Sequence, residues 1–412
     1  MKLARTFLDW HGRLFAKGGR LERLYPIQEA LDTFLFTPEH VTPGAPHVRD
    51  ALDLKRTMGM VIVALIPCIL MAMYNTGLQA NLAIENTVAR GGHAAQGWRQ
   101  QLVLMLGLGF SSGSVLSCFV HGAAHFLPLL FVTYAIGGAW ETLFSVVRRH
   151  EINEGFLVTG MLFPLICPPT LPLWQAALGI SFGVVLGKEV FGGTGMNFLN
   201  PALTARCFLF FAYPQDISGA DVWVAGVDGY THATMLNVIK AKGAAALMPD
   251  AGAPGWMNCF LGFEAGSMGE TSALACLIGA ATLIATRVGS WRTMAGVSVG
   301  TIVTASLFNW LASGAGRPAF TTPFWWHMVL GGWAFGTVFM ATDPVSSAFT
   351  HGGKWIYGFF IGFFVVLVRV INPAFDGGMM LAILLMNVFA PTIDYFIVRR
   401  HIRRRAARHA TA

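Results

Sequence analysis

Long stretches without a charged residue are the feature that most constrains this chain. Asp, Glu, Lys and Arg are missing from Thr57 to Ile84, Phe156 to Gly187, Thr293 to Gly316 and Pro318 to Thr342. About 20 apolar residues in a helix cross the roughly 30 Å of a bilayer's hydrocarbon core. The chain is 54% apolar and 12% charged, whereas soluble proteins are about a quarter charged. We therefore predict an all-α polytopic membrane protein.

About ten transmembrane helices can be placed. Their predicted limits are 57–76, 124–146, 155–168, 172–190, 198–213, 270–286, 292–312, 323–341, 354–371 and 377–396. Some of these helices are short or broken, because Pro168-Pro169 divides an uncharged stretch that cannot hold two full spans. Broken helices free backbone groups, which a membrane tolerates only beside a cavity or cofactor. Similar strings at 55–58 and 291–294 are compatible with an internal two-fold repeat.

The basic residues predict the orientation of the chain. With both termini in the cytoplasm, most of the 28 Lys and Arg lie on the cytoplasmic side, as the positive-inside rule requires. Because the net charge of +7 is distributed in this way, we expect membrane lipid around the chain and no nucleic-acid partner. The predicted segments are an amphipathic amino-terminal segment (1–56), a first membrane bundle (57–213), an outer loop (214–269), a second membrane bundle (270–397) and a basic tail (398–412). Residues 98–120 are expected to form an outer loop.

The outer loop contains two strings that bear on chemistry. Asp228 to Thr234 reads DGYTHAT, and Gly266 to Thr271 reads GSMGET before the sixth span. Taken alone, the first string is typical of turns. The second is compatible with an ordinary helix cap, or with a helix amino end whose free N–H groups hold a phosphate.

Several longer strings resemble one known family at the same time. They are the DGYTHAT string, which is similar to the signature at which flavin transferases esterify FMN onto the last threonine, and the segments 153–156, 168–174, 188–195, 197–202 and 341–346. Over nearly its whole length the chain resembles the B subunit of the sodium-translocating NADH:quinone oxidoreductases (Na⁺-NQR). One departure is His232, which stands where the flavin-attachment signature usually has glycine.

The resemblance implies two flavins. FMN would be bound covalently to Thr234 through a phosphoester, with Asp228, Ser267, Gly269 and Thr271 around it, and a flavin transferase would attach it. A non-covalent riboflavin would lie at Asn197, Asn200 and Asp343. The Asn200-Pro201 pair also has a simpler interpretation, because such a pair opens a helix.

The resemblance also implies a quinone site and a sodium pathway. Ubiquinone would bind at Gly137 and Gly138, where a flat ring can approach the backbone. Close helix packing is the competing interpretation of these glycines. Glu141, Asp343 and Asp394 would line the sodium pathway, since carboxylates coordinate hard cations. The alternatives are pairing of Glu141 with Arg148, and solvation of Asp394 at the interface beside Arg399.

The implied function is that of a membrane redox subunit. It would act with the other subunits of a Na⁺-pumping NADH:ubiquinone reductase in the bacterial inner membrane, with the Thr234 loop in the periplasm. One alternative is the homologous membrane subunit of an Rnf ferredoxin:NAD complex, which shares the flavin threonine. The other is a secondary transporter without a redox centre, which the broken helices alone would permit.

Overall fold

The computed structural model describes residues 54–410 and a few single residues before them. Within 54–410 it leaves out 92–96, 150–151, 153–154, 220, 228–232, 248–253, 316 and 373–376. The predicted amino-terminal segment thus lies almost wholly outside the described residues, as do Asp228 and His232. All regular secondary structure in the described part of the chain is helical, which confirms the predicted class.

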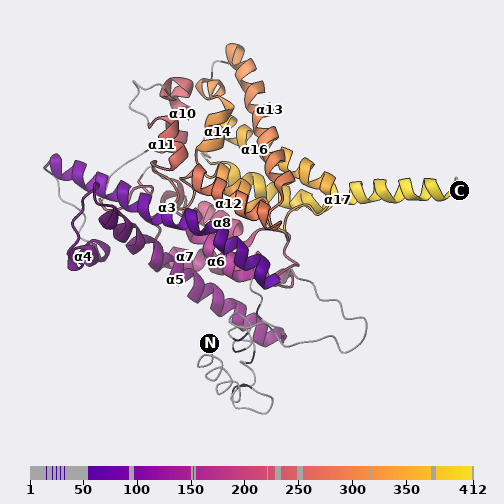
Figure 1. The fold of residues 1–412 in the computed structure, drawn as a ribbon, viewed down its shortest axis with the longest axis horizontal. Helices are drawn as coiled ribbons and strands as arrows, with labels where there is room; N and C mark the ends of the chain where they lie inside the picture. Colours follow the sequence, from indigo (N-terminus) through magenta and orange to yellow (C-terminus); the bar gives the residue numbers. More distant parts are fainter. Residues whose placement is uncertain are drawn as a thin grey trace.

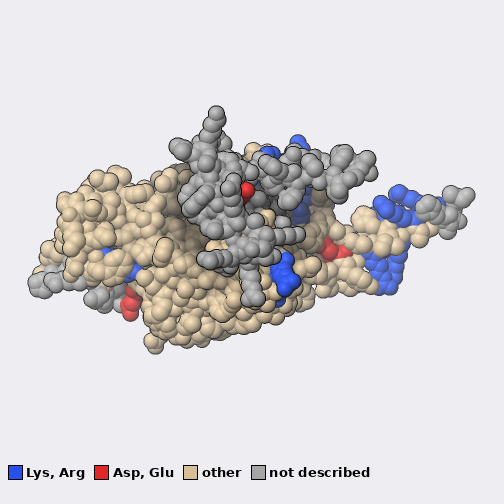
Figure 2. All heavy atoms as spheres, turned by 90° about the horizontal axis from the view of Figure 1, so that it is seen from below, with Lys and Arg blue, Asp and Glu red and all other residues tan. Residues whose placement is uncertain are grey.

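Five helices in the described residues are long and apolar enough to cross a membrane. They are α3 (Leu54–Ala89), α5 (Val115–Arg148), α13 (Trp291–Ala315), α16 (His351–Ile371) and α17 (Met379–Ala410). At 1.5 Å per residue even α16, with 21 residues, is about 30 Å long. The chain is therefore a multi-pass membrane protein. The last turns of α17 project beyond the bundle (Figure 1), and Figure 2 shows the largest group of Lys and Arg on that end.

Four further apolar helices in the part of the chain that is described are too short to cross a membrane alone. They are α6 (Gly155–Ile166), α7 (Leu173–Val185), α8 (Pro201–Ala212) and α12 (Ala273–Ala285). Each has 12 or 13 residues, which is about 18–20 Å of helix. The predicted eighth span is broken into α14 (Phe324–Val329), α15 (Trp333–Phe335) and a π-helical turn, η6 (Gly336–Met340). Short helices are thus present where the prolines predicted them, whereas the break in the eighth span was not predicted.

Several helices begin or end at other residues than the predicted spans. Helix α3 continues to Ala89, and α5 begins at Val115, where the Ser114 hydroxyl accepts a hydrogen bond from Ser117 N (3.3 Å). Residues 98–120 are therefore not a simple loop, because they contain α4 (Trp98–Met105) and the first turns of α5. The 214–269 region also contains helices, namely α9 (Pro214–Ser218), α10 (Met235–Lys242), η3 (Gly243–Leu247) and α11 (Trp256–Leu261). The remaining short elements are η2 (Glu189–Phe191) and η5 (Pro318–Thr321).

Glycines let the long helices approach closely in two places. On α3 and α5, a Cβ atom at Gly77 would overlap the carbonyl of Cys118. On α13 and α16, a Cβ atom at Gly300 would overlap the carbonyl of Phe359, and one at Gly362 the carbonyl of Val297. Small residues at such contacts are the usual basis of helix packing in membranes. Each half of the chain thus contains one glycine-packed pair of long helices, and the internal repeat stays a prediction.

Candidate flavin, quinone and ion sites

The first candidate site is a cavity around Thr234, of about 660 Å³ counted to its open mouth. Thr234 stands immediately before α10, and Arg206 and Phe210 reach the cavity from α8. The segment 264–271 before α12 and the break between α14 and α15 complete the walls.

Three polar atoms in the described lining of this Thr234 cavity are buried without a hydrogen-bond partner. They are Thr234 Oγ1, Thr271 Oγ1 and Trp223 Nε1. Buried polar groups nearly always have partners, so each such atom needs an explanation. Three of them on one cavity indicate that a polar ligand is their partner.

The Thr234 cavity also contains an ion pair and a second carboxyl group. Arg206 Nη1 lies 3.0 Å from Glu270 Oε1, and Arg206 Nη2 donates to Ser267 Oγ at 3.2 Å. Glu264, in the segment between α11 and α12, is buried in the wall. Burial raises the pKa of its carboxyl to about 8, although a hydrogen bond from the Gly331 backbone opposes the shift.

Arg369 of α16 maintains the helix break beside this cavity. Its guanidinium donates to His327 O at 2.6 Å, to Leu330 O at 2.9 Å and to Gly377 O at 3.0 Å. Two of these carbonyls belong to α14 and its carboxyl end, where the helical pattern of hydrogen bonds stops. The buried arginine therefore satisfies backbone groups that a continuous helix would have paired.

Most residues predicted around the FMN are gathered here. Ser267 and Thr271 line the cavity with Thr234. Gly269 does not: its N–H donates to Leu165 O at 2.7 Å, and a Cβ atom there would press on the Leu165 side chain. Three residues of this site were not predicted from the sequence, namely Trp223, Glu264 and Arg206. An arginine inside an otherwise apolar helix is the one signal that could have identified the site.

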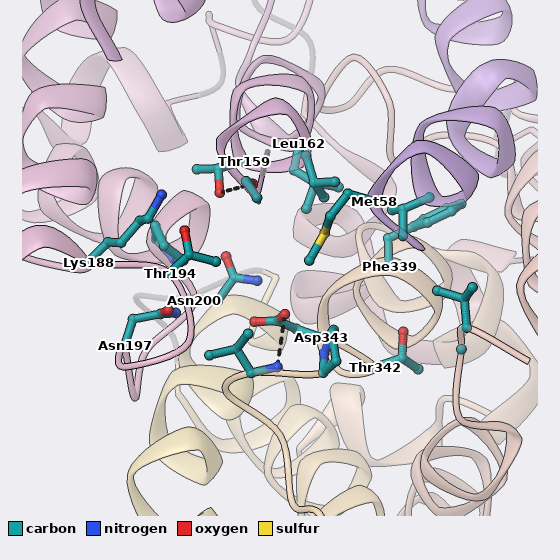
Figure 3. A pocket seen from close by; sticks show the side chains of 18 of the residues that line it. Met58, Thr159, Leu162, Lys188, Thr194, Asn197, Asn200, Phe339, Thr342 and Asp343 are labelled. Atoms are coloured by element: carbon teal, nitrogen blue, oxygen red, sulfur yellow. Dashed lines mark hydrogen bonds between the residues drawn. The ribbon is translucent and has the colours of Figure 1, made fainter. Parts of the chain in front are cut away.

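The second candidate site is a cavity around Asn200, of about 680 Å³ counted to its open mouth. It brings together Asn197, Asn200 and Asp343, the three residues predicted to hold riboflavin. The Asn200 amide and the Asp343 carboxylate point into the same space (Figure 3). Met58 and Phe339 contribute apolar walls from α3 and η6.

Local hydrogen bonds fix the polar groups of this Asn200 cavity. Asn200 Oδ1 accepts from Ala202 N (3.0 Å) and Leu203 N (3.2 Å), so the residue does open α8 as the simpler interpretation held. Asp343 accepts from Ser346 Oγ at 2.6 Å and from Val345 N at 3.3 Å. Thr194 Oγ1 is buried without a partner in the same wall. The amide of Asn200 and the hydroxyl of Thr194 thus remain for a ligand.

Glu141 forms a buried ion pair at the edge of the Asn200 cavity. Its Oε1 lies 2.5 Å from Nζ of Lys188, a residue that also lines the cavity. Both side chains are almost fully buried, at 4% and 3% exposure. The alternative of pairing with Arg148 is corrected, because Arg148 pairs with Glu189 at 3.5 Å.

The other predicted quinone and sodium residues have structural contacts of their own. A Cβ atom at Gly137 would overlap the Phe156 ring, whereas one at Gly138 would lie 3.8 Å from that ring. Neither glycine lines the two cavities. Asp394 accepts from Phe349 N (2.6 Å), Thr350 N (3.1 Å) and Thr350 Oγ1 (2.5 Å). It therefore holds the backbone before α16, including the N-cap residue Thr350, instead of being merely solvated beside Arg399.

Comparison with known proteins identifies the family of the chain. The chain matches the NQR2, RnfD, RnfE family over residues 41–403. It is 54% identical over 409 residues to the B subunit of the Na(+)-translocating NADH-quinone reductase of Azotobacter vinelandii, covering 98% of this chain and 99% of that protein. The proteins of the same name from Pseudomonas paraeruginosa and Yersinia pestis are each 53% identical, with the same coverage. The chain therefore belongs to the NQR2, RnfD, RnfE family.

Proposed function

We propose that this chain is the membrane-embedded B subunit of a sodium-translocating NADH:quinone reductase and that it carries FMN esterified to Thr234. Its relatives of 53–54% identity have that name, which favours this complex over the homologous Rnf complex. The observation that carries the flavin proposal is the group of unpartnered polar atoms around Thr234 Oγ1. A bound flavin supplies reversible electron transfer, and the protein supplies its position and its electrostatic surroundings.

The lining of the Thr234 cavity suits a flavin phosphate and ring. The covalent bond to Thr234 Oγ1 would hold the phosphate in this cavity, and Arg206 of the same lining, which is paired with Glu270, would offset part of its negative charge. The hydroxyl of Thr271 and the indole N–H of Trp223 can donate to phosphate or ring oxygens. Thr234 itself has no role as a helix cap, because its side chain makes no capping hydrogen bond. Its hydroxyl is therefore free to be modified without loss of α10.

The Asn200 cavity is proposed to hold riboflavin. Among the described residues that line it, the one Lys or Arg is Lys188, whose Nζ is paired with Glu141. An already neutralised cation favours a ligand without phosphate. The amide of Asn200, the amide of Asn197 and the hydroxyl of Thr194 offer hydrogen bonds to ribityl hydroxyls or to a flavin ring, and Met58 and Phe339 offer apolar contact.

The quinone site and the sodium pathway are proposed at the residues suggested by the family. Ubiquinone would lie against Gly138, where there is room beside the Phe156 ring, and Gly137 would support that surface. Glu141, Asp343 and Asp394 would supply oxygen ligands to Na⁺. The proposed topology puts both termini in the cytoplasm of a bacterial inner membrane and Thr234 in the periplasm. The partners are the other subunits of the complex and a flavin transferase.

Replacement of the flavin-bearing threonine tests the central proposal. We expect Thr234→Ala, co-expressed with the transferase, to lose the in-gel flavin fluorescence and the mass of one FMN less one water. Thr271→Ala removes a hydroxyl from the same cavity and should keep the covalent flavin. An unmodified Thr234 peptide in wild-type protein would overturn the flavoprotein proposal and leave the secondary transporter as the better interpretation.

Replacement of Asn200 tests the riboflavin site. Asn200→Asp keeps the capping oxygen of α8 but loses the amide donor, so the fold should be retained. We expect riboflavin to bind this variant roughly five- to tenfold more weakly, since one hydrogen bond contributes about 1 kcal/mol. The measurement is the amount of non-covalent flavin that denaturation releases from the purified protein. The covalent flavin in the same sample is the internal control. Unchanged riboflavin content in Asn200→Asp and in Asn197→Ala would contradict the assignment.

Added bulk at Gly138 tests the quinone site. Gly138→Leu should weaken quinone-analogue inhibitors roughly tenfold by filling the ring position, with covalent flavin unchanged. Gly59→Leu on α3 is the matched control, because a Cβ atom at Gly59 meets nothing within 4 Å. Gly137 is unsuitable, since any side chain there displaces Phe156. Equal inhibition of the wild type and of Gly138→Leu would move the site elsewhere.

The sodium role of Glu141 must be separated from its role in the ion pair. Glu141→Gln leaves the buried Lys188 with the more distant carboxylate of Glu189, at 3.9 Å, and loss of a partner from a buried ion pair commonly destabilises a protein by about 3–5 kcal/mol. The double variant Glu141→Gln, Lys188→Met removes both charges and should fold. We expect its half-saturating sodium concentration to rise roughly tenfold through loss of a carboxylate ligand. The Lys188→Met variant alone is the control, and a wild-type sodium dependence in the double variant would count against Glu141.

A further inference from the structure

A third hollow adjoins the Asn200 cavity, and the two share Val288, Gly289, Thr342 and Pro344 in their linings. It measures about 1210 Å³ counted to its open mouth and lies among the end of α12, the start of α13 and the segment leading into α16. Three basic side chains line it, namely Arg287, Arg292 and Lys354. Arg287 and Arg292 are close in sequence, at the link between α12 and α13, and the fold adds Lys354 from α16.

No acidic side chain is found among the described residues that line this basic hollow. In the part of the chain that the structure describes, no salt bridge joins Arg287, Arg292 or Lys354 to a carboxylate. Two acids of neighbouring segments are held elsewhere: Asp343 accepts from Ser346 Oγ, and Asp394 accepts from Thr350. Three like charges around one open space repel one another, so an anion placed among them is stabilised.

Backbone orientation adds to the positive charge. Helices α13 and α16 both begin at this hollow, and neither has an acidic residue in its first turn. Helix amino ends carry partial positive charge that favours anions. Arg287 has a φ of 60° at the end of α12, a left-handed conformation that usually belongs to glycine or asparagine. An arginine is thus present where glycine would fit the backbone better.

Apolar side chains adjoin the basic ones. Ile284 and Phe349 line the same hollow and are 41% and 71% exposed. Trp291, also in the lining, is half-exposed and packs edge-on against Trp355 of α16. Tryptophans of this kind mark the membrane–water interface. The hollow therefore offers cations for a phosphate and exposed apolar surface for acyl chains.

We propose that the basic hollow binds one anionic phospholipid, with its phosphate among Arg287, Arg292 and Lys354 and its chains along Ile284 and Phe349. Basic pockets between transmembrane helices are known to take such headgroups. A soluble phosphate compound would use the same cations but would not cover the apolar side chains. An acidic segment of a partner protein would use the cations without selecting lipid. The proposal depends on membrane residence alone and is independent of the flavin sites.

Lipid retention by the full-length chain in neutral detergent tests the proposal. Native mass spectrometry during titration with phosphatidylglycerol or phosphatidylcholine should show one preferred phosphatidylglycerol. Replacing Arg287, Arg292 and Lys354 with Gln should weaken that binding roughly a hundredfold. Each basic residue near an anionic lipid strengthens binding roughly fivefold, and the three factors multiply. The matched control is Arg400→Gln, Arg403→Gln, Arg404→Gln, which removes the same charge from the exposed tail.

Three results would overturn the lipid site. These are equal phosphatidylglycerol binding by the wild type and the hollow triple variant, equal retention of the two lipids by the wild type, and full displacement of the lipid by inorganic phosphate or glycerol phosphate. If the triple variant does not fold, Arg292→Gln and Arg292→Lys replace it. Arg292→Lys keeps the charge and should retain more lipid than Arg292→Gln, and equal retention by these two variants would contradict the proposal.

Discussion

The hydrogen bonding of backbone groups freed at helix ends is the constraint on which this structure depends. Helices α6, α7, α8 and α12 are too short to cross a bilayer, and the 324–340 region is divided into three pieces. Hydrocarbon offers no partner for the exposed N–H and C=O groups, so side chains must provide them. Arg369 donates to three carbonyls around one break, and Asp394 accepts from the backbone before α16. Cavities can then persist beside the breaks without collapse of the surrounding helices.

Helix α8 connects the two candidate flavin cavities. Asn200 caps its first turn and faces one cavity, while Arg206 and Phe210 face the other. Its 12 residues are on the order of 18 Å long. A full-length span would place its two ends near opposite membrane surfaces, whereas this short helix brings both cavities inside the protein. The brevity that the Asn200-Pro201 pair predicted is therefore a condition for having two sites close together.

Sequence patterns predicted the class and most helices, and the family resemblance predicted some residues of both cavities, but neither predicted side-chain partners well. Uncharged stretches and proline positions depend on local chemistry, so they located α6, α7 and α8. The eighth span was predicted as one helix, 323–341, and the structure divides it into three pieces. The gathering of Asn197 and Asn200 with Asp343 was expected from the family resemblance, since no local rule joins residues so far apart. Arg148, on the same helix, was the alternative partner considered for Glu141. The structure pairs it with Lys188 from beyond α7, a tertiary contact that periodicity does not encode.

The Glu141–Lys188 pair constrains how the proposed sodium pathway and the Asn200 cavity can interact. Lys188 Nζ occupies one oxygen of Glu141 and also lies in the wall of that cavity. A cation that binds at this oxygen must displace the ammonium group. Negative charge placed in the cavity attracts Lys188 and weakens its hold on Glu141, because opposite charges interact strongly where water is excluded. On the proposed pathway, one lysine therefore responds both to the charge of a bound flavin and to the occupancy of a carboxylate. This arrangement links the two sites electrostatically without requiring a movement of any helix.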